Sequence, residues 1–334
     1  MLSSSMSMWS SPSSLVPRTV TSSSTLSWIS WRHLCDPWKS LPVNEFELID
    51  EILSVLGETA RGGVIDPGDD CAAISLPEGE LLLSSIDTLI GGVHFPEDAP
   101  GHLVGYRAMM VSVSDLAAMG ANPIQLLVAM TLEEKDKNWA LEVAGGMAEA
   151  ARATGGAILG GNLARGPRSI TISVHGSCPP AEVLQRSGAA VGDGVYVTGP
   201  LGSSAAAVAA QCLGDLEDPR TRRYFRPGAR IEAGIALRTV ANSCIDVSDG
   251  LLQDLGHICK ASGVGAELVS AEIPIGEGAS LDHALHGGDD YELLFTAASP
   301  PADLDAVRIG TIAEGEGIRL DGEPVAIKGY QHFL

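Results

Sequence analysis

From residue 43 onwards, hydrophobic and polar residues follow each other in blocks that predict helices and strands in turn. The segment NEFELIDEILSVLG (44–57) has apolar residues at helical spacing, Asn44 as a cap, Glu47 at the capping-box position and Gly57 as a stop signal. We therefore expect a helix here. Its buried face is predicted to be the apolar stripe Phe46, Ile49, Ile52, Leu53 and Leu56.

The blocks that follow alternate between short β-like runs and longer helical ones. In chain order they predict a strand at 80–87, a helix at 101–120 that Gly120 ends, a strand at 125–132, a helix at 138–153, and strands at 157–161 and 170–176. This order predicts one α/β unit that ends near residue 180.

A second unit follows with the same alternation. It is predicted to contain a strand at 193–199, a helix at 203–213, a helix after Pro227, a strand at 244–248, a helix at 250–263, a strand at 291–297, and short β-like pieces at 308–315 and 317–327. The two blocks imply an α/β or α+β chain of two halves, 43–180 and 181–334.

Residues 1–42 differ sharply from the rest, because they are rich in Ser, hold four of the five Trp residues and contain a single acidic residue, Asp36. A Ser-rich leader with few acids is typical of a transit peptide, but an expression tag containing LVPR or a wrongly assigned start would produce the same composition. We expect a disordered or non-native extension and exclude it from the fold.

The charge balance limits the classes of partner. With 42 acidic and 21 basic residues, the net charge of −21 opposes binding to nucleic acid or to anionic membranes. No apolar run is long enough to span a membrane. The six cysteines are scattered without zinc-site spacing, which favours reduced thiols in a cytoplasmic protein. An acidic protein that handles phosphates would need metal cations as intermediaries.

Five segments place a carboxylate beside Gly, Ser or a short apolar run. They are GDD (68–70), SSIDT (84–88), SVSDL (112–116), IDVSDG (245–250) and GGDDYEL (287–293). Mg²⁺ prefers carboxylate, hydroxyl and water oxygens, and it is usually held by one or two carboxylates together with substrate phosphates. Convergence of these segments would therefore suit a site for Mg²⁺ and phosphate.

Each of these carboxylates could have a structural role instead of binding a metal ion. A single Asp beside Gly is more often a turn or cap residue than a ligand, and Asp249 could simply cap the next helix. Asp246 lies inside an apolar strand and cannot be explained in this way. Asp115 lies in an apolar helix, where an unpaired carboxylate is costly, so a ligand or paired role is as well supported as a cap.

Other phosphate-binding signals are weak. There is no G-x-x-x-x-G-K-[ST] segment, which excludes a P-loop, and GPLGSS (199–204) offers only a helix N-terminus with small residues. Arg186 and His94 lie near Gly residues, and each taken alone is more often structural than functional.

Nine segments, in order and across both halves, together resemble the thiamine-monophosphate kinase family, which belongs to the superfamily of aminoimidazole ribonucleotide synthetase. They are GDDCAAI, IDTLIGGVHF, SDLAAMGANP, GGN, RSGAAVGD, VYVTGPLGSSAAAV, IDVSDGLLQDLGHICKASGVGA, GGDDYELLFT and KGYQHF. The resemblance runs from about residue 43 to the C-terminus. It implies ATP-dependent, Mg²⁺-dependent phosphorylation of thiamine monophosphate to thiamine diphosphate, the last step in making that cofactor, by direct in-line transfer.

The resemblance also implies roles for residues that match the family's motifs. The implied Mg²⁺ ligands are Asp70, Ser85, Asp87, Asp115, Asp246 and Asp249. The implied ATP contacts are Gly161, Asn162, Arg186 and Ser248, and the implied thiamine monophosphate contacts are His94, Asp289 and Tyr330. Arg186 would clamp a phosphate and Tyr330 would stack on the cationic thiamine ring.

Three positions depart from the family's pattern. Asn162 stands where the family has the Asp of GGD, which weakens one expected Mg²⁺ site. Asp289 replaces the usual Glu of GGEDYEL and is shorter by one methylene, and Ile86 replaces a Thr, so only its backbone could serve a metal.

The superfamily's fold implies two α/β halves and a homodimer in which N-terminal strands of two copies form a shared barrel. Two other functions stay open. One is a sister ATP-dependent activity such as selenophosphate synthetase or the hydrogenase-maturation dehydratase. Two features argue against it: no Cys followed by Lys lies in a Gly-rich N-terminal loop, and the sequence ends in YQHFL without a terminal Cys. The other is a non-catalytic relative that binds divalent ions.

Overall fold

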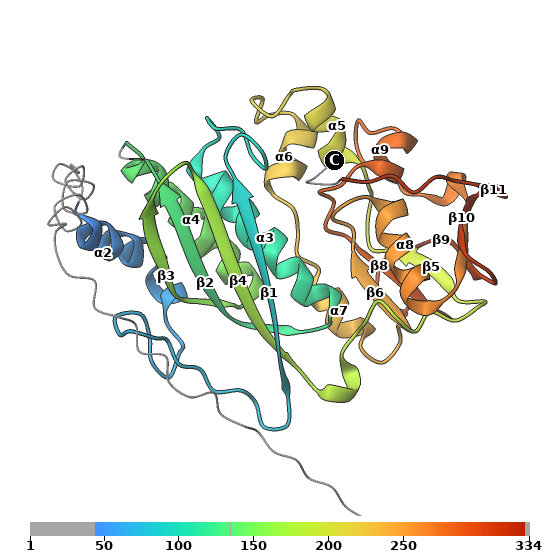
Figure 1. Cartoon of the computed structure of the whole chain (residues 1–334), viewed down its shortest axis with the longest axis horizontal. Coiled ribbons are helices and arrows are strands. Elements are labelled where there is room, and N and C mark those ends of the chain that lie inside the picture. Colours follow the sequence, from blue (N-terminus) through green and yellow to red (C-terminus); the bar gives the residue numbers. More distant parts are fainter. Residues whose placement is uncertain (1–43, 134, 331–334) are drawn as a thin grey trace, which may run out of the picture. The chain divides into compact units, whose positions relative to one another are not determined.

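The computed structural model describes residues 44–133 and 135–330, so the expectation for residues 1–42 lies outside the described residues. Within these ranges the strands form one four-stranded and one seven-stranded sheet, with helices packed on both (Figure 1). The mixed α/β class predicted from the alternating blocks is confirmed. None of the helices in the described part of the chain has the length and apolar character that a membrane span requires.

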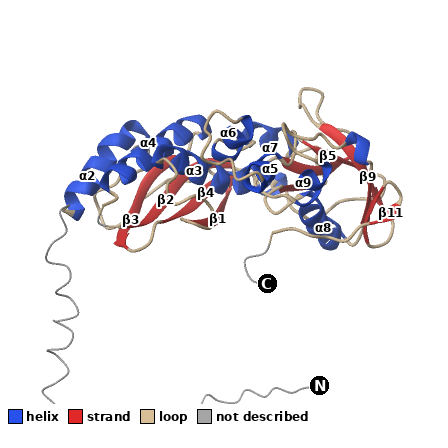
Figure 2. Ribbon diagram, turned by 90° about the horizontal axis from the view of Figure 1, so that it is seen from above, coloured by secondary structure: helices blue, strands red, loops and turns tan. Residues whose placement is uncertain are grey.

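The four-stranded sheet belongs to the first half of the chain. Its spatial order is β1 (Leu81–Ile90), β4 (Ser169–Cys178), β2 (Asn122–Leu132) and β3 (Ala157–Arg165). β4 is antiparallel to both β1 and β2, and β3 is parallel to β2. Helices α3 (Gly101–Ala118) and α4 (Lys137–Thr154) cover one face of this sheet (Figure 2), and α2 (Glu45–Leu56), with the 3₁₀ turn Gly57–Ala60, packs on α4.

The seven-stranded sheet belongs to the second half. Its spatial order is β11 (Glu323–Pro324), β10 (Gly317–Leu320), β7 (Gly265–Leu268), β9 (Val307–Ala313), β5 (Gly194–Val197), β8 (Leu293–Ala297) and β6 (Ser243–Asp246). The helices of this half are α5 (Ser203–Ala209), α6 (Pro219–Phe225), α7 (Ile231–Leu237), α8 (Leu251–Ser262) and α9 (Leu281–His286), and 3₁₀ turns lie at Pro180–Glu182 and Ser270–Glu272. β10 and β7 are parallel, and the other pairs are antiparallel.

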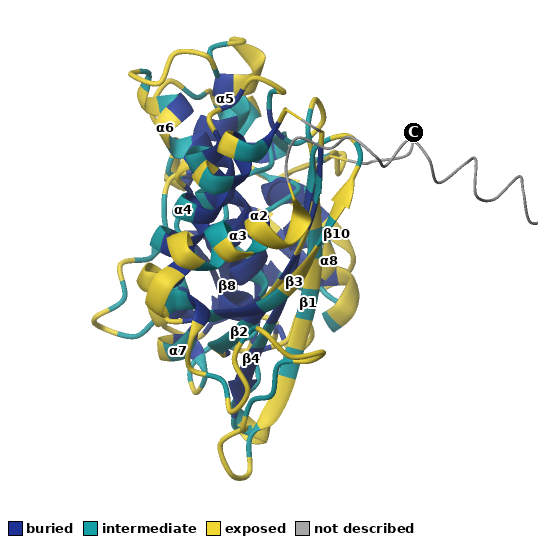
Figure 3. Cartoon of the chain, turned by 90° about the vertical axis from the view of Figure 1, so that its left-hand side faces the viewer, coloured by how far each residue is buried: buried dark blue, intermediate teal, exposed yellow. Residues whose placement is uncertain are grey.

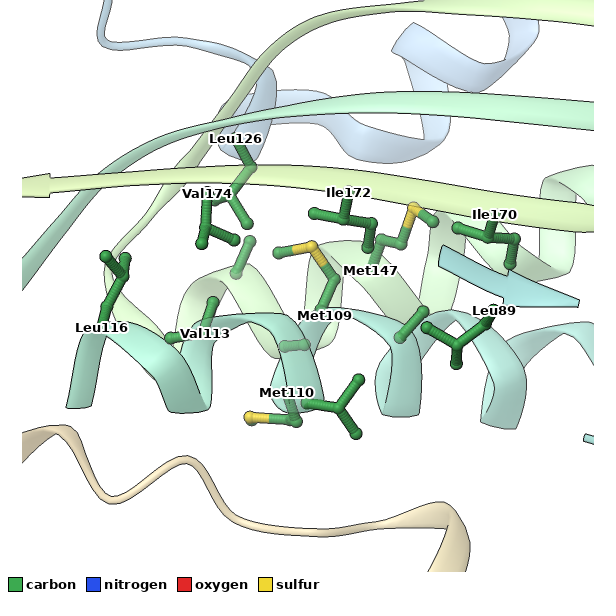
Figure 4. Close-up of a cluster of buried hydrophobic side chains, with 14 of the residues drawn as sticks. Leu89, Met109, Met110, Val113, Leu116, Leu126, Met147, Ile170, Ile172 and Val174 are labelled. Carbon is green, nitrogen blue, oxygen red and sulfur yellow. The ribbon is translucent and has the colours of Figure 1, made fainter. Parts of the chain in front are cut away.

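Helix α3 is buried on almost every side because both sheets lie against it. On β8, Leu293 and Phe295 join the hydrophobic cluster that contains α3, whereas Leu294 joins a second cluster with α8, as expected when side chains alternate along a strand. In Figure 4, Met109 of α3 points toward Ile172 of β4, and Met110 points to the opposite side of the helix. α3 therefore connects the two halves of the chain.

The predicted buried face of α2 was wrong for one residue, Phe46. Asn44 caps α2 as expected, and its side chain accepts a hydrogen bond from the N–H of Phe46. The buried residues of α2 are Leu48 and Leu56, whereas Phe46 is 75% exposed. At about 100° per residue, Phe46 lies on the opposite side of the helix from Leu48, so the apolar spacing alone misassigned this residue.

Three elements were not predicted from the sequence. α6 begins after the cap Asp218 and is rich in Arg, so it has no apolar stripe to reveal it. β7 and α9 have only four and six residues, which is too short for a periodic signal. An ion pair with Glu292 holds α6, pairing with β9 holds β7, and packing against α8 and α5 holds α9, so all three depend on residues distant in the sequence.

Asp290 is a fully buried carboxyl group that holds the start of α5. Both of its oxygens accept a hydrogen bond from the N–H of Gly202, at 2.9 and 2.8 Å. Burial raises the pKa of Asp290 from 3.8 to about 8, although the bond from Gly202 acts in the opposite direction. Between these values the folded state binds more protons than the unfolded chain, so this group lowers the stability as the pH rises.

Replacing Asp290 with Asn is expected to remove this pH dependence, because a neutral amide still accepts the bond from Gly202. Relative to Asp290→Asn, the wild-type free energy of unfolding is expected to fall by up to about 1.4 kcal/mol per pH unit between about pH 5 and pH 8. Urea unfolding of both proteins at several pH values measures the difference. Parallel curves over this range would contradict the expectation.

Candidate active site

A cavity of about 310 Å³ lies where β1, the C-terminal end of α3 and β6 meet. Its polar lining includes Ser85, Asp115, Arg186 and Asp246, which are four of the residues implied by the family resemblance. The rest of the lining is mainly apolar and includes Leu116 and Ile245 among others. Residues from both halves of the chain therefore share one cavity.

The alternation along β1 decides which of its side chains reach this region. Ser85 and Asp87 lie on the less exposed face of the strand, which packs toward α3, whereas Ile86 lies on the other face and is 65% exposed. α3 carries Asp115 in its last turn. Strand and helix together bring these polar side chains to one place.

Two Ser hydroxyls hold the two central carboxylates. Ser85 Oγ donates a hydrogen bond of 2.5 Å to Asp115 Oδ2, and Ser114 Oγ donates one of 2.6 Å to Asp246 Oδ2. Asp246 is the last residue of β6, so the second bond joins the two halves of the chain. Each carboxylate is therefore oriented by a hydroxyl from the first half.

The carboxyl groups oppose each other's ionisation. Burial raises the pKa of Asp246 to about 7, and the charges of Asp115 and Asp87 act in the same direction. Burial also raises the pKa of Asp87 to about 6, with a further contribution from Asp115. A cation bound here would reverse this effect, since an opposite charge favours the ionised form.

The oxygen atoms of Ser85, Asp115 and Asp246 could coordinate a metal ion. Among residues 44–133 and 135–330, no three His, Cys, Asp or Glu side chains are placed to hold an ion by themselves. Mg²⁺ seldom uses such a complete protein cage, because phosphate and water oxygens supply much of its coordination. Asp115, Asp246 and Ser85 match the partial share that a protein usually contributes. These residues therefore fit Mg²⁺ bound jointly with phosphate.

The loop after β6 carries Ser248 and Asp249, and one carboxylate oxygen holds it. Asp254 Oδ2 accepts hydrogen bonds from the N–H groups of Ser248, Asp249 and Gly250, at 3.1, 3.2 and 3.1 Å. Burial raises the pKa of Asp254 to about 7. Asp254 was not predicted from the sequence, although an acidic residue in the first turn of a helix after SDG is a usable signal.

Tyr330 lies beside the same loop. Its N–H donates to the carbonyl of Asp249 at 3.2 Å, and Gln253 Nε2 donates both to Asp249 Oδ2 at 2.9 Å and to the Tyr330 carbonyl at 3.2 Å. The structure therefore brings an expected Mg²⁺ ligand and an expected substrate residue together. Gln253 was not predicted from the sequence.

The other two expected substrate residues, His94 and Asp289, are joined through Arg107 and Tyr224. Arg107 forms an ion pair of 2.6 Å with Asp289, and its guanidinium lies 3.9 Å from the centre of the Tyr224 ring. The Tyr224 hydroxyl donates to the His94 carbonyl at 2.5 Å. Neither Arg107 nor Tyr224 was predicted, although a cationic residue inside the apolar segment GYRAMMV was a possible signal.

The remaining expected residues, Asp70, Gly161 and Asn162, do not line the cavity that contains Ser85, Asp115 and Asp246 in the described part of the chain. Asp70 lies in an exposed loop, where its N–H bonds to Asp69 Oδ1 at 2.8 Å, so Asp69 serves a local turn. Gly161 and Asn162 lie on β3, and β4 and β2 separate them from β1. At about 4.8 Å per strand, β3 and β1 are roughly 14 Å apart. One metal ion cannot bridge Asp87 and Asn162 of the same copy.

Gly161 is restricted by its surroundings rather than by a special backbone conformation. A Cβ atom there would lie 1.9 Å from the carbonyl oxygen of Val128 on β2. Only Gly fits this close approach of neighbouring strands.

Family models match both halves of the chain. The AIR synthase related protein N-terminal domain matches residues 68–178, and the AIR synthase related protein C-terminal domain matches residues 190–322. The two-half fold with an acidic cavity at the junction thus defines the class of AIR synthase-related proteins.

Individual relatives narrow this class. Thiamine-monophosphate kinase of Escherichia coli K12 is 39% identical over 318 residues, which cover 86% of this chain and 98% of that protein. The crystal structure of thiamine-monophosphate kinase from Stenotrophomonas maltophilia has a TM-score of 0.76 and 36% identity, and the match covers 85% of this chain and 98% of that one. A structure described as AaThiL complexed with AMPPCP and TMP has a TM-score of 0.72 and 31% identity, and the match covers 88% and 100%. The chain belongs to the thiamine-monophosphate kinase family.

Proposed function

We propose that this protein transfers the γ-phosphate of ATP directly to thiamine monophosphate and forms thiamine diphosphate and ADP. The observation that carries the proposal is the cavity in which Ser85, Asp115, Arg186 and Asp246 come together from both halves of the chain. The relatives named thiamine-monophosphate kinase, and the related complex with AMPPCP and TMP, support the same substrates.

The metal-binding residues in this proposal are Asp87, Asp115, Asp246 and Ser85. The family resemblance adds Asp249, on the loop after β6, and Asp70, which lies in an exposed loop apart from these residues. When bound, Mg²⁺ supplies positive charge that lets two anionic phosphate groups approach each other. The protein's part is to hold the carboxylates in place through the Ser85 and Ser114 hydroxyls. Such prior orientation lowers the entropic cost of assembling the reacting groups.

The remaining residues divide between the two substrates. Arg186, on the wall of the cavity, is proposed to contact ATP phosphates, with Ser248 on the loop held by Asp254 and with Gly161 and Asn162. His94, Asp289 and Tyr330 are proposed to bind thiamine monophosphate. The acceptor phosphate oxygen then attacks the γ-phosphorus in line, and the mechanism needs no covalent phosphoenzyme.

The direct test is formation of ADP and thiamine diphosphate by the purified protein from ATP, Mg²⁺ and thiamine monophosphate. We expect equal amounts of both products and no turnover when EDTA removes the metal. Absence of thiamine diphosphate, together with ATP-dependent phosphorylation of another acceptor such as selenide, would favour a sister activity. No turnover with any of these substrates, but retained Mg²⁺ binding, would favour a non-catalytic relative.

We propose that the protein is a homodimer whose four-stranded sheets face each other in a shared barrel. On the sheet face that α3 and α4 leave uncovered, Leu82, Ile86 and Leu127 are 49%, 65% and 36% exposed. Figure 3 shows exposed stretches in yellow along β1. Burying such a patch favours association.

Light scattering is expected to give a mass twice that of one chain, and Ile86→Glu is expected to lower the mass to that of one chain. A wild-type mass of one chain would contradict the proposal.

The dimer also bears on Asn162, which is too distant from β1 of its own copy to share an ion with Asp87. In a closed barrel, Asn162 would join this site only from the second copy. Restoring a carboxylate with Asn162→Asp is then expected to lower the Mg²⁺ concentration for half-maximal rate by about 3- to 10-fold, because it adds a charged ligand. A Mg²⁺ titration of the rate measures this, with Asn162→Ala as control. Identical titrations of wild type and Asn162→Asp would show that the substitution is neutral.

We propose two halves at residues 43–180 and 181–334 and a cytoplasmic location. The family models, which end at residue 178 and begin again at 190, support the division. The five cysteines in the described ranges are free thiols, which suits a reducing compartment.

A further inference from the structure

Arg107 is a cationic residue in the middle of α3 that is only 2% exposed. Burial of a charge is costly unless the charge is paired and hydrogen-bonded. Arg107 Nη2 donates to Asp289 Oδ1 at 2.6 Å, and Nη1 donates to the Tyr224 carbonyl at 2.7 Å. The Tyr224 ring also stacks against the guanidinium. These contacts hold Arg107 against residues of the second half of the chain.

Through these contacts Arg107 reaches both His94 and Asp289. Asp289 is its direct partner, and His94 is held by the hydroxyl of Tyr224. The His94 ring is oriented separately, because its Nδ1 accepts a hydrogen bond of 3.1 Å from the N–H of Ile90. His94 follows β1, and Asp289 lies between α9 and β8. One buried guanidinium thus brings together two segments from different halves.

The segment that carries Asp289 is held in an unusual conformation. Asp289 and Tyr291 have φ values of 69° and 53°, which non-Gly residues seldom adopt. Backbone bonds of 2.9 and 2.8 Å to the carbonyls of Ser248 and Val247 help to maintain it. Such conformations persist only where several contacts impose them, and they occur often at functional sites.

The Asp289 carboxylate is also oriented by its bonding pattern. Arg107 Nη2 and the Tyr291 hydroxyl, at 2.8 Å, both donate to Oδ1. In the described part of the chain Oδ2 is therefore the oxygen that remains available to a ligand, and the Asp289 side chain is 34% exposed. A carboxylate fixed in this way can accept a hydrogen bond from a cationic substrate with little loss of side-chain freedom.

We propose that Arg107, together with Tyr224, is the positioning residue of the acceptor-substrate site: it orients the Asp289 carboxylate toward thiamine monophosphate and fixes the segment of His94 beside it. This inference rests on the proposed function. It assigns to Arg107 an effect on the acceptor substrate and none on ATP. A residue needed only for stability would affect both substrates equally.

The test measures KM for thiamine monophosphate at saturating ATP, KM for ATP at saturating thiamine monophosphate, and kcat. Arg107→Met is expected to raise KM for thiamine monophosphate by about 10- to 100-fold and to leave KM for ATP within about twofold. Arg107→Lys is expected to have a KM for thiamine monophosphate between those of the wild type and Arg107→Met. A single ammonium can pair with Asp289 but cannot also bond Tyr224 in the same fork geometry.

The matched control is Arg238, a second Arg that joins the two halves. Its Nε donates to the Gly120 carbonyl at 2.6 Å, its side chain is 12% exposed, and it contacts neither His94 nor Asp289. Arg238→Met is expected to lower the thermal midpoint without changing either KM. If Arg107→Met leaves KM for thiamine monophosphate unchanged, or raises both KM values equally, the inference is overturned.

Milder variants keep the test decisive if Arg107→Met does not fold. Tyr224→Phe and Tyr291→Phe each remove one hydroxyl donor and are expected to raise KM for thiamine monophosphate by about 3- to 10-fold. Unchanged KM values in both would overturn the inference. A wild type that does not phosphorylate thiamine monophosphate would overturn the proposed function itself, an outcome distinct from wild-type turnover with unaffected variants.

Discussion

Replacing Asp246 with Asn is expected to lower kcat by at least about 100-fold while the fold stays intact, because catalysis of phosphoryl transfer depends largely on electrostatic stabilisation. Asn has nearly the same shape as Asp, and its carbonyl can still accept the hydrogen bond from Ser114. The variant loses only the negative charge that would bind Mg²⁺. Steady-state kinetics at saturating ATP and thiamine monophosphate measure the effect.

The same substitution is expected to leave the thermal midpoint unchanged or raise it. Burial and the charge of Asp115 disfavour ionised Asp246 in the metal-free protein, as its raised pKa of about 7 indicates. A neutral side chain removes that unfavourable term. Lower activity with equal or greater stability would separate a functional carboxylate from a structural one.

Asp193→Asn is a suitable control, because Asp193 is a buried carboxylate outside the cavity that accepts bonds from Asn242 Nδ2 at 3.0 and 2.9 Å. It is expected to keep the wild-type kcat. Asp115→Asn, at the partner carboxylate, is expected to behave like Asp246→Asn. Wild-type rates from both site variants would mean that these carboxylates are not metal ligands.

Replacing Asp254 with Ala is expected to lower activity by about 10- to 100-fold, the usual effect of removing a group that orients metal ligands. Its Oδ2 is the common acceptor for three backbone N–H groups of the loop that carries Ser248 and Asp249. Without it, buried donors lose their partner and the loop loses its conformation. The concentration of Mg²⁺ needed for half-maximal rate is expected to rise with the loss of activity.

Asp254→Asn provides the matched comparison, because the amide keeps one carbonyl oxygen for the same three donors. We expect it to retain most of the activity that Asp254→Ala loses. Equal losses in both variants would show that the charge of Asp254 matters rather than its role as an acceptor. Wild-type activity from Asp254→Ala would remove the residue from the site altogether.

Much of the architecture could be predicted from local pattern. The long helix before Gly120 and the strands around it were predicted because their apolar runs are long and end at clear signals. α6 was missed because its residues bond to distant partners, as Arg223 does to Glu292. Phe46 was placed on the wrong face because helical spacing leaves open which side of the helix meets a neighbour.

Some residues of the candidate site carry a signal in the sequence, and others do not. Asp115 and Asp246 stood out because a carboxylate within apolar residues requires a partner. Arg107 carried the same signal, since it interrupts an apolar helix, but its meaning depended on Asp289. Gln253 and Asp254 have ordinary positions in a helix, and only their bonds to the loop of Asp249 distinguish them.

The sequence by itself determined the mixed α/β class and the family, and it predicted the candidate carboxylates, because these follow from residue types and spacings along the chain. Only the tertiary structure decided which of them meet. Ser114 and Asp246 are 132 positions apart, and they bond because α3 lies between the two sheets. Asp87 and Asn162 belong to one small sheet, yet strand order keeps them at opposite edges. Contacts of this kind depend on strand order and helix packing, which local spacing does not specify.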